Sequence, residues 1–378
     1  MKFTVQRQQL IASVQDVMKA ISPRTAIPIL SGIKLEAGPN GITLTGSDSD
    51  ISIESFIPAE TDGMVYVEQI EAGSIVLQAR YFSDIVRKLP EKTVDIETDN
   101  KFNVTIKSGK ALFKLNGQDA GEYPQLPEVA SSNSFDIPSD LLKNLIRQTG
   151  FAVSTMETRP ILTGVNIELA DGTLSFTATD SHRLAARSVP MENAQFSISN
   201  VVVPGKSLNE LAKVLDDDDD NVQISITNNQ ILFQTSHLHF LSRLLDGNFP
   251  ETARLIPEQS QTVIHVKTKD LINTIDRASL LAREERNNVV RLTTENKQDL
   301  HITSNSPEVG QASEEVQLQA VEGDDLKISF SAKYMLDALK VIENEDVRIE
   351  FTGAMRPFVL RPADDNSVLQ LILPVRTY

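Results

Sequence analysis

The chain of 378 residues contains no cysteine and no tryptophan. Without thiols, neither disulfides nor thiolate metal sites can form. Aromatic residues make up only 5% of the sequence, so we do not expect a stacking platform for single-stranded nucleic acid. No apolar run approaches the length that spans a bilayer, and no charged-then-apolar leader follows Met1. We therefore expect a cytoplasmic protein.

Motifs that support enzyme chemistry are also missing. The sequence has no Gly-x-Ser-x-Gly elbow, glycine-rich phosphate loop or His-Glu-x-x-His pair, and its five histidines show no metal-ligand spacing. The run Asp180-Ser181-His182 suggests a hydrolase relay, but we expect it on a strand, where adjacent side chains point to opposite faces. The acidic run from Asp216 to Asp220 is interpreted as a solvated loop. We expect no catalysis, no metal and no cofactor.

One pattern recurs three times along the chain. Each copy opens with a short alternating strand, at positions 3, 135 and 264, so the openings lie 132 and 129 residues apart. The runs Pro28-Ile29-Leu30-Ser31-Gly32 and Pro160-Ile161-Leu162-Thr163-Gly164 then occur at matching places, and we expect each to pass from a loop into a strand. This spacing predicts three domains of equal size.

Each copy has two halves, and each half has a helix followed by alternating strands. Helices are expected over residues 8–19, 80–89, 138–147, 206–215, 269–277 and 332–342. Strands over residues 94–97, 222–226 and 347–351 alternate with period two, which is typical of half-buried antiparallel strands. These patterns predict an α+β fold in which sheets carry two helices on one face. The predicted domains are residues 1–127 (N-terminal), 128–254 (central) and 255–378 (C-terminal).

Basic residues are concentrated on the predicted helices. The formal net charge of −16 would by itself oppose contact with nucleic acid. Five of the six helices nevertheless carry a basic pair opposite the apolar stripe: Arg80 and Arg87, Lys143 and Arg147, Lys206 and Lys213, Lys269 and Arg277, Lys333 and Lys340. On one helix this would be an ordinary solvent face. On five helices of an acidic chain, it favours a surface that contacts phosphates without reading base sequence.

Over essentially its whole length, the sequence resembles the bacterial DNA polymerase III beta subunit family, the sliding clamps. The most specific matching segments are Met1 to Val5, Arg24 to Leu30, Thr179 to Leu184, Asp246 to Pro250, and Leu373-Pro374-Val375-Arg376. The resemblance implies a head-to-tail homodimer, a ring of six similar domains whose helices line a hole for duplex DNA. It also implies that Arg24 and Arg159, in loops, contact that DNA.

The family further implies a hydrophobic groove between the central and C-terminal domains. This groove receives short linear peptides from the replicative polymerase, the clamp loader, other polymerases and repair proteins. The matching positions here are Leu162, Thr179, Ser181, His182, Arg183, Leu184, Pro250, Arg254, Leu255, Leu371, Leu373, Pro374, Val375 and Arg376. We expect its arginines to hold peptide carbonyls or acidic groups. Ser181 replaces a frequent glycine of the family, and the tail extends to Thr377 and Tyr378.

The ring also requires a seam between two copies. Opposite charges suggest that a basic end of the N-terminal domain meets an acidic end of the C-terminal domain. The residues expected there are Lys107, Lys110, Phe113, Lys114, Leu280, Leu281, Glu308, Glu314 and Glu315. The alternative hypothesis is a sequence-specific DNA-binding regulator. That alternative predicts a recognition helix with base-reading side chains, and none stands out.

Overall fold

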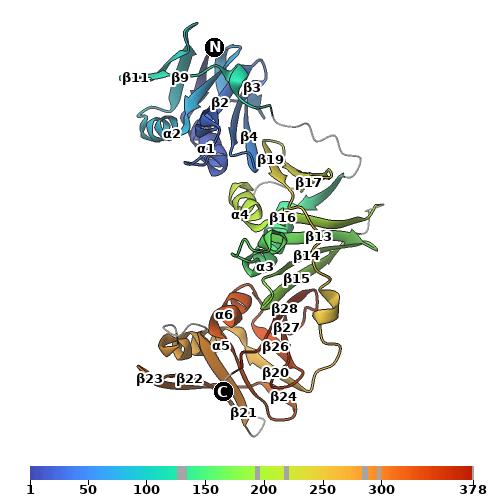
Figure 1. Cartoon of the computed structure of the whole chain (residues 1–378). Coiled ribbons are helices and arrows are strands. Elements are labelled where there is room, and N and C mark those ends of the chain that lie inside the picture. The colour runs from blue at the N-terminus through green and yellow to red at the C-terminus, as the bar shows by residue number, and fades with distance from the viewer. Residues whose placement is uncertain (126–133, 192–195, 217–220, 283–287, 296–298, 377–378) are drawn as a thin grey trace. The chain divides into compact units, whose positions relative to one another are not determined.

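A computed structural model describes residues 1–125, 134–191, 196–216, 221–282, 288–295 and 299–376 (Figure 1). The chain divides into two compact units. Unit 1 comprises residues 1–142 and 210–244, and unit 2 comprises residues 143–209 and 245–378. The predicted boundary after residue 127, the acidic residues 217–220 and the tail residues Thr377 and Tyr378 lie outside the described residues.

Unit 1 contains two large antiparallel sheets and a short hairpin. The eight-stranded sheet has the order β12 (Ser134–Pro138), β17 (Asn221–Ile226), β18 (Gln230–Gln234), β19 (Leu238–Arg243), β4 (Ile51–Pro58), β3 (Gly41–Ser47), β2 (Gly32–Gly38), β8 (Gly73–Gln78). The five-stranded sheet has the order β11 (Ala111–Asn116), β10 (Asn103–Ser108), β9 (Thr93–Thr98), β1 (Lys2–Gln6), β7 (Val67–Glu71). The hairpin pairs β5 (Glu60–Thr61) with β6 (Met64–Val65).

Unit 2 also contains two antiparallel sheets. The nine-stranded sheet has the order β16 (Ile198–Pro204), β13 (Gly164–Ala170), β14 (Thr173–Thr179), β15 (Arg183–Pro190), β28 (Val368–Ile372), β27 (Phe358–Pro362), β26 (Asp346–Phe351), β20 (Thr262–Lys267), β24 (Ala320–Gly323). The four-stranded sheet has the order β23 (Gly310–Gln317), β22 (Asp299–Ser306), β21 (Val289–Glu295), β25 (Lys327–Ser331). Each unit therefore combines one sheet that joins two sequence copies with a smaller sheet from a single copy.

Six α-helices occur in the described residues, and a strand runs directly into each one (Figure 1). They are α1 (Arg7–Val17), α2 (Ala79–Lys88), α3 (Ser139–Thr149), α4 (Gly205–Val214), α5 (Thr268–Ala278) and α6 (Ala332–Lys340). Short 3-10 helices are η1 (Met18–Ala20), η2 (Pro28–Ser31), η3 (Ala120–Glu122), η4 (Gly150–Ala152), η5 (Pro160–Thr163), η6 (Ala253–Leu255) and η7 (Ser279–Leu281). The strand–helix repeat confirms the predicted α+β class.

Helix α2 illustrates how the sequence selects this arrangement. Phe82, Val86 and Leu89 recur at intervals of four and three residues, and their side chains are fully buried beside β2 and β8. Arg80 and Arg87 are exposed. Arg87 also lies in the last turn, where a cation interacts favourably with the carbonyl end of the helix dipole. Burial of the apolar stripe therefore fixes the direction in which the bases point.

One local prediction was wrong. The two Pro-Ile-Leu runs do not pass directly from a loop into a strand but first form η2 and η5. In each, the leucine N–H donates to the carbonyl three residues earlier, from Leu30 to Ile27 and from Leu162 to Arg159, at 3.0 Å in both cases. Proline lacks an N–H and has a fixed φ, so it suits the first position of such a turn.

Candidate functional site

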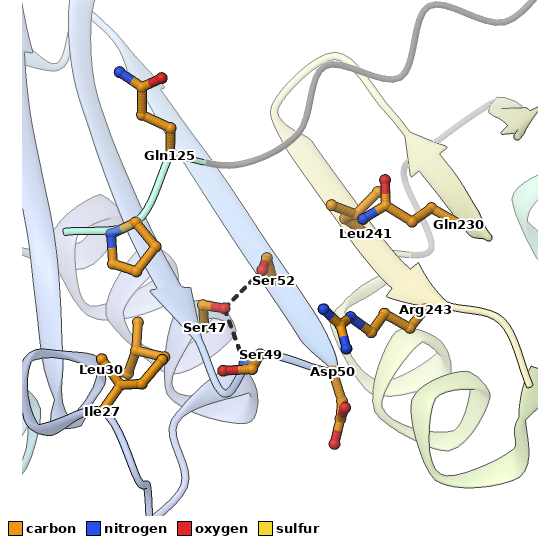
Figure 2. A pocket seen from close by; sticks show the side chains of 11 residues that line it. Ile27, Leu30, Ser47, Ser49, Asp50, Ser52, Gln125, Gln230, Leu241 and Arg243 are labelled. Atoms are coloured by element: carbon orange, nitrogen blue, oxygen red, sulfur yellow. Dashed lines mark hydrogen bonds between the residues drawn. The ribbon is translucent and has the colours of Figure 1, made fainter.

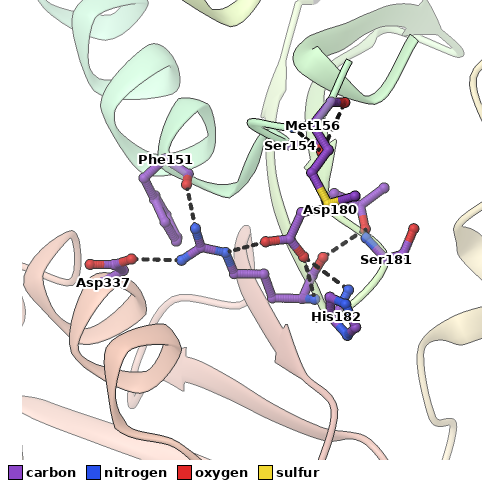
Figure 3. A network of polar contacts seen from close by, with 9 residues as sticks. Phe151, Ser154, Met156, Asp180, Ser181, His182 and Asp337 are labelled. Carbon is purple, nitrogen blue, oxygen red and sulfur yellow. Dashed lines mark hydrogen bonds and ion pairs between the residues drawn. The ribbon is translucent and has the colours of Figure 1, made fainter. Parts of the chain in front are cut away.

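The first candidate site is the turn that joins β14 to β15 (Figure 3). Asp180, Ser181 and His182 form this turn instead of the predicted strand, and Ser181 has a left-handed φ of 76°. One oxygen of the Asp180 carboxylate accepts the backbone N–H groups of His182 at 2.9 Å and of Arg183 at 3.0 Å. The turn forms because an aspartate side chain satisfies two amides locally.

The same contacts disfavour the hydrolase relay. The second carboxylate oxygen of Asp180 accepts from Nε of Arg183 at 3.0 Å. The His182 ring instead stacks on Tyr334, with ring centroids 6.3 Å apart. An acid held by backbone amides and a guanidinium does not orient a histidine as a general base. The expectation of no relay therefore rests on the contacts of this turn and not on strand geometry.

Arg183 is the most constrained side chain of this region, and its partners Phe151, Asp180 and Asp337 are labelled in Figure 3. It is only 8% exposed, and its other two guanidinium nitrogens donate to Asp337 at 2.7 Å and to the carbonyl of Phe151 at 2.8 Å. Its guanidinium carbon lies 4.6 Å from the centre of the Tyr334 ring and 5.3 Å from that of Phe151. Three of its five N–H groups thus already have acceptors, and the other two belong to a largely buried guanidinium, so the expectation that Arg183 holds a peptide stays a prediction.

The remaining groove positions divide by exposure. The buried ones are Leu162, Thr179, Leu184 and Leu371. The exposed ones are Ser181, His182, Pro250, Arg254, Leu255, Leu373 and Arg376, and Pro374 and Val375 are half-buried. Leu255 and Leu373 are 52% and 38% exposed, unusually high for leucine. Two of the buried positions, Leu184 and Leu371, belong to an aliphatic cluster with Val359 and Leu369, and Ile256, which follows Leu255, packs against this cluster.

The end of the described chain is fixed by two backbone hydrogen bonds. The N–H of Leu373 donates to the carbonyl of His182 at 3.0 Å, and that of Val375 donates to the carbonyl of Ser329 at 2.7 Å. Leu373 therefore lies beside the Asp180–His182 turn. Sequence reasoning missed Tyr334 and Asp337 as supports of Arg183, since nothing in their local sequence marks them as partners of a residue about 150 positions earlier. It also missed Ser329 as the partner of Val375.

Nine of the twelve basic residues predicted to face DNA form two groups. Four pair with a carboxylate of the same chain: Arg87 with Asp84, Arg147 with Glu343, Lys213 with Glu210, and Arg277 with Glu314. Five are exposed and have no ion-pair partner among the described residues: Arg80, Lys206, Lys269, Lys333 and Lys340. Lys143 is half-buried, and Arg24 and Arg159 are exposed in the loops before η2 and η5. A carboxylate neighbour lowers the attraction of a base for phosphate, so the unpaired group is the stronger set of candidates.

The seam residues lie on and beside two edge strands. β11 is an outer strand of the five-stranded sheet, and β23 is an outer strand of the four-stranded sheet. Lys107 precedes β11 on β10, Lys110 lies in the turn between them, and Phe113 and Lys114 are exposed on β11. Near β23, Glu308, Glu315 and Leu280 are exposed and Leu281 is half-buried. An edge strand leaves backbone groups free to pair with another chain.

Glu314 differs from the other seam residues, because it forms a hydrogen-bonded ion pair with an arginine of the same chain. Its carboxylate accepts three hydrogen bonds from Arg277, at 3.2, 3.1 and 2.7 Å. These bonds hold the pKa of the Glu314 carboxyl below its usual range. Arg277 and Glu314, assigned from the sequence to two different surfaces, thus form one ion pair between α5 and β23.

Within the described ranges, no group of three or more His, Asp or Glu side chains could hold a metal ion. In the same part of the chain, no helix has both the length and the apolar character to cross a membrane.

Comparisons with known proteins agree along the whole chain. The families of the DNA polymerase III beta subunit match as its N-terminal domain over residues 1–127, its central domain over residues 136–251 and its C-terminal domain over residues 253–376. The beta sliding clamp of Bacillus subtilis is 57% identical over 378 residues, and that of Staphylococcus epidermidis is 50% identical, each covering both chains fully.

Solved structures give the same result. The crystal structure of the DNA polymerase sliding clamp from Bacillus subtilis matches with a TM-score of 0.97 at 57% identity. The DNA polymerase III beta chain from Streptococcus pneumoniae matches with a TM-score of 0.95 at 39% identity. Both matches cover 100% of this chain and 100% of the solved chain.

Proposed function

Because the chain belongs to the DNA polymerase III beta subunit family and is therefore a DNA sliding clamp, we propose that its surfaces divide among three tasks. They close a ring, lie along duplex DNA and receive partner peptides. A sliding clamp is a non-catalytic processivity factor that encircles DNA as a dimer and binds the polymerase. Family membership leaves the alternative of a sequence-specific regulator without support.

Ring closure is assigned to the two edge strands, and their open edges are the single observation that carries this proposal. The five-stranded sheet ends at β11 and the four-stranded sheet ends at β23, while the larger sheets already join two sequence copies each. Pairing β11 of one protomer with β23 of its partner would complete a third joined sheet. Lys110 and Lys114 would then meet Glu308 and Glu315, with Phe113 in the apolar centre. Such a heterologous contact closes after two copies.

Duplex DNA is assigned to the helix surfaces and two loops. Arg80, Lys206, Lys269, Lys333 and Lys340 have no carboxylate partner among the described residues, so they would make the strongest phosphate contacts. Arg87, Lys143, Arg147, Lys213 and Arg277 would contribute less. Arg24 and Arg159 would add contacts from the loops. Contacts of this kind are independent of base sequence and weaken with salt, which suits a protein that slides.

Peptide binding is assigned to the exposed aliphatic and basic residues of unit 2. Leu255 and Leu373 would receive apolar anchors, and Arg254 and Arg376 would meet peptide carbonyls or carboxylates. The side chain of Arg254 is 81% exposed and its pair with Glu251 is 3.3 Å long, so it can exchange partners readily. Arg183 would fix the shape of this groove from below, as a positioning residue.

The three domains are proposed at residues 1–127, 128–254 and 255–378, and the ranges matched by the three domain families support these limits. Cytoplasmic location is proposed on the same basis, because the relatives act in DNA replication.

The ring proposal is tested by topology. The full-length protein is placed on nicked circular plasmid by an ATP-dependent clamp loader, and the plasmid is then cut once. We expect retention on circles and rapid loss from linear DNA, since only a closed ring is held by topology. Retention on linear DNA, or a strictly monomeric protein by light scattering at micromolar concentration, would contradict the proposal.

A further inference from the structure

Unit 1 contains a pocket that no task above uses (Figure 2). It encloses about 200 Å³ next to the turn between β3 and β4 and the end of β19. Its apolar wall is formed by Ile27, Leu30, Pro124 and Leu241. Its polar rim is formed by Ser49, Asp50, Gln125, Gln230 and Arg243. Leu30 belongs to a buried cluster with Ile29, Val76, Ala120 and Tyr123, so the wall is backed by packed core.

The pocket is built on the same backbone device as the Asp180–His182 turn of unit 2. Asp48 accepts the N–H groups of Asp50 at 3.0 Å and of Ile51 at 2.9 Å through one oxygen. Asp180 likewise accepts the N–H groups of the residues two and three positions later, His182 and Arg183, through one oxygen. Ser49 has a left-handed φ of 81°, close to the 76° of Ser181.

Strand pairing places the two regions in the same register. Leu241 pairs with Ser52 on the neighbouring strand, as Leu371 pairs with Leu184. Two positions further, the N–H of Arg243 donates to the carbonyl of Asp50 at 2.9 Å, as that of Leu373 donates to the carbonyl of His182 at 3.0 Å. The pocket is therefore the structural counterpart, in unit 1, of the groove assigned to partner peptides in unit 2.

Two side-chain differences give this counterpart its own chemistry. Ser52 stands where unit 2 has Leu184, and its hydroxyl is bonded to the Ser47 hydroxyl at 2.7 Å (Figure 2). The smaller side chain leaves space beside Leu241. Arg243 stands where unit 2 has Leu373, so a guanidinium replaces an aliphatic group at the rim. The guanidinium is exposed, and no described side chain forms an ion pair or hydrogen bond with it.

Size and charge together define the occupant. A cavity of about 150 Å³ lined by aliphatic side chains accepts one benzene ring, whereas pockets for cofactors and drug-sized ligands exceed about 300 Å³. The pocket therefore holds one large apolar side chain and not a whole cofactor. Around it, Ser49, Gln125 and Gln230 present hydrogen-bonding groups that match peptide amides, and Arg243 matches a carboxylate.

We propose that this pocket is a second docking site of the clamp, for a partner peptide that inserts one leucine- or phenylalanine-sized side chain beside Leu241 and places an adjacent carboxylate on Arg243. The site goes beyond the groove of unit 2 and has a different preference, because the exposed guanidinium of Arg243 stands at the position where unit 2 has the apolar Leu373. A partner that carries two linear motifs could occupy both.

The probe for this site is the capped dipeptide acetyl-Phe-Asp-amide, titrated into the full-length protein with ¹³C-labelled Ile and Leu methyl groups. We expect saturable shifts at Ile27, Leu30 and Leu241. The matched probe acetyl-Phe-Asn-amide lacks the charge and should bind about tenfold more weakly, a difference of about 1.4 kcal/mol, since it cannot form the charge-assisted hydrogen bond with Arg243. Arg243→Gln should weaken acetyl-Phe-Asp-amide by a similar factor and abolish the difference between the probes.

Two further variants separate the sites. Ile27→Glu changes an exposed wall residue and should abolish the methyl shifts without affecting folding. Ser52→Leu should also abolish them, because the larger side chain fills the space beside Leu241. Leu255→Glu, in the groove of unit 2, should leave the shifts at Leu30 and Leu241 unchanged. Shifts confined to Leu255 and Leu373 would refute the second site while supporting the groove. Shifts nowhere, or an Arg243→Gln protein that binds as the wild type does, would also overturn it.

Discussion

Replacing Arg183 with alanine is expected to destabilise unit 2 and not merely to weaken peptide binding. The guanidinium is 8% exposed and joins Asp180, Asp337 and the carbonyl of Phe151. The side chain of Asp180 is 13% exposed. Removing the cation therefore leaves an almost buried carboxylate and a partly buried carbonyl without one of their donors.

The magnitude follows from these exposures. Breaking a buried pair by removing one partner costs about 3–5 kcal/mol. The Asp337 side chain is 30% exposed and so partly screened by solvent, which places the expected loss near the lower end of that range. We expect the free energy of unfolding to fall by about 3 kcal/mol, and the lost contact between Arg183 and the Tyr334 ring accounts for part of this decrease. For a unit of this size, about 2–4 °C per kcal/mol converts this to a fall in Tm of roughly 6–12 °C.

The loss is measured by calorimetry on the full-length protein, with hydrogen exchange of β15 and α6 as the local readout. Arg254→Ala is the matched control, because that side chain is 81% exposed and should change stability by less than about 0.5 kcal/mol. In a double-mutant cycle, Asp337→Asn should reduce the cost of Arg183→Ala by about 1–2 kcal/mol, since the carboxylate left behind is then neutral. An Arg183→Ala protein with wild-type Tm and exchange, but no peptide binding, would show that Arg183 contacts the peptide directly.

Three further predictions concern the ring and its charges. Phe113→Asp should shift the dimer to monomer in light scattering without lowering Tm, and an unchanged mass would remove β11 from the seam. Lys333→Ala should reduce the salt-dependence slope of DNA binding by about 1. Arg87→Ala should reduce this slope less, because Arg87 is already paired with Asp84. Equal reductions would contradict the distinction between unpaired and carboxylate-paired bases. Arg277→Ala should raise the Glu314 pKa toward its ordinary value in a carboxyl NMR titration. Because the folded pKa is lowered, the pair stabilises the fold above the ordinary carboxyl pKa and loses that effect as pH falls through the lowered value.

Helix positions could be predicted from the sequence because local patterns determine them. Apolar residues at helical spacing and a preceding alternating strand fix each of the six helices to within about two residues of its observed ends. The joining of sequence copies into common sheets could not be predicted in the same way. Strand β19 pairs with β4, and Leu238 lies opposite Ser55. Nothing in either strand specifies a partner about 180 residues away, because edge pairing uses backbone groups that every residue carries.

In the candidate site, too, single residues could be predicted from the sequence but their distant partners could not. Arg183 could be identified from its sequence motif, but its role depends on Asp337, which is 154 residues further along the chain. The pairing of Arg277 with Glu314 could not be predicted for the same reason, since the local sequence around each residue indicates only a charged surface. Local sequence thus indicates which side chains are unusual. Which of them remain free to bind a partner is decided by contacts that only the folded chain creates.

The repeated turn explains how one fold can carry several docking surfaces. In both units an aspartate caps two amides, a serine takes a left-handed conformation, and the strand that follows is joined to a second sequence copy. At the junction in unit 2, Leu184 packs in a buried aliphatic cluster with Leu371. At the junction in unit 1, Ser52 and Leu241 line a pocket that has Arg243 and Asp50 at its rim. Under the two docking proposals, repetition would fix where partners dock, and substitution at a few positions in each copy would set which peptide each place prefers.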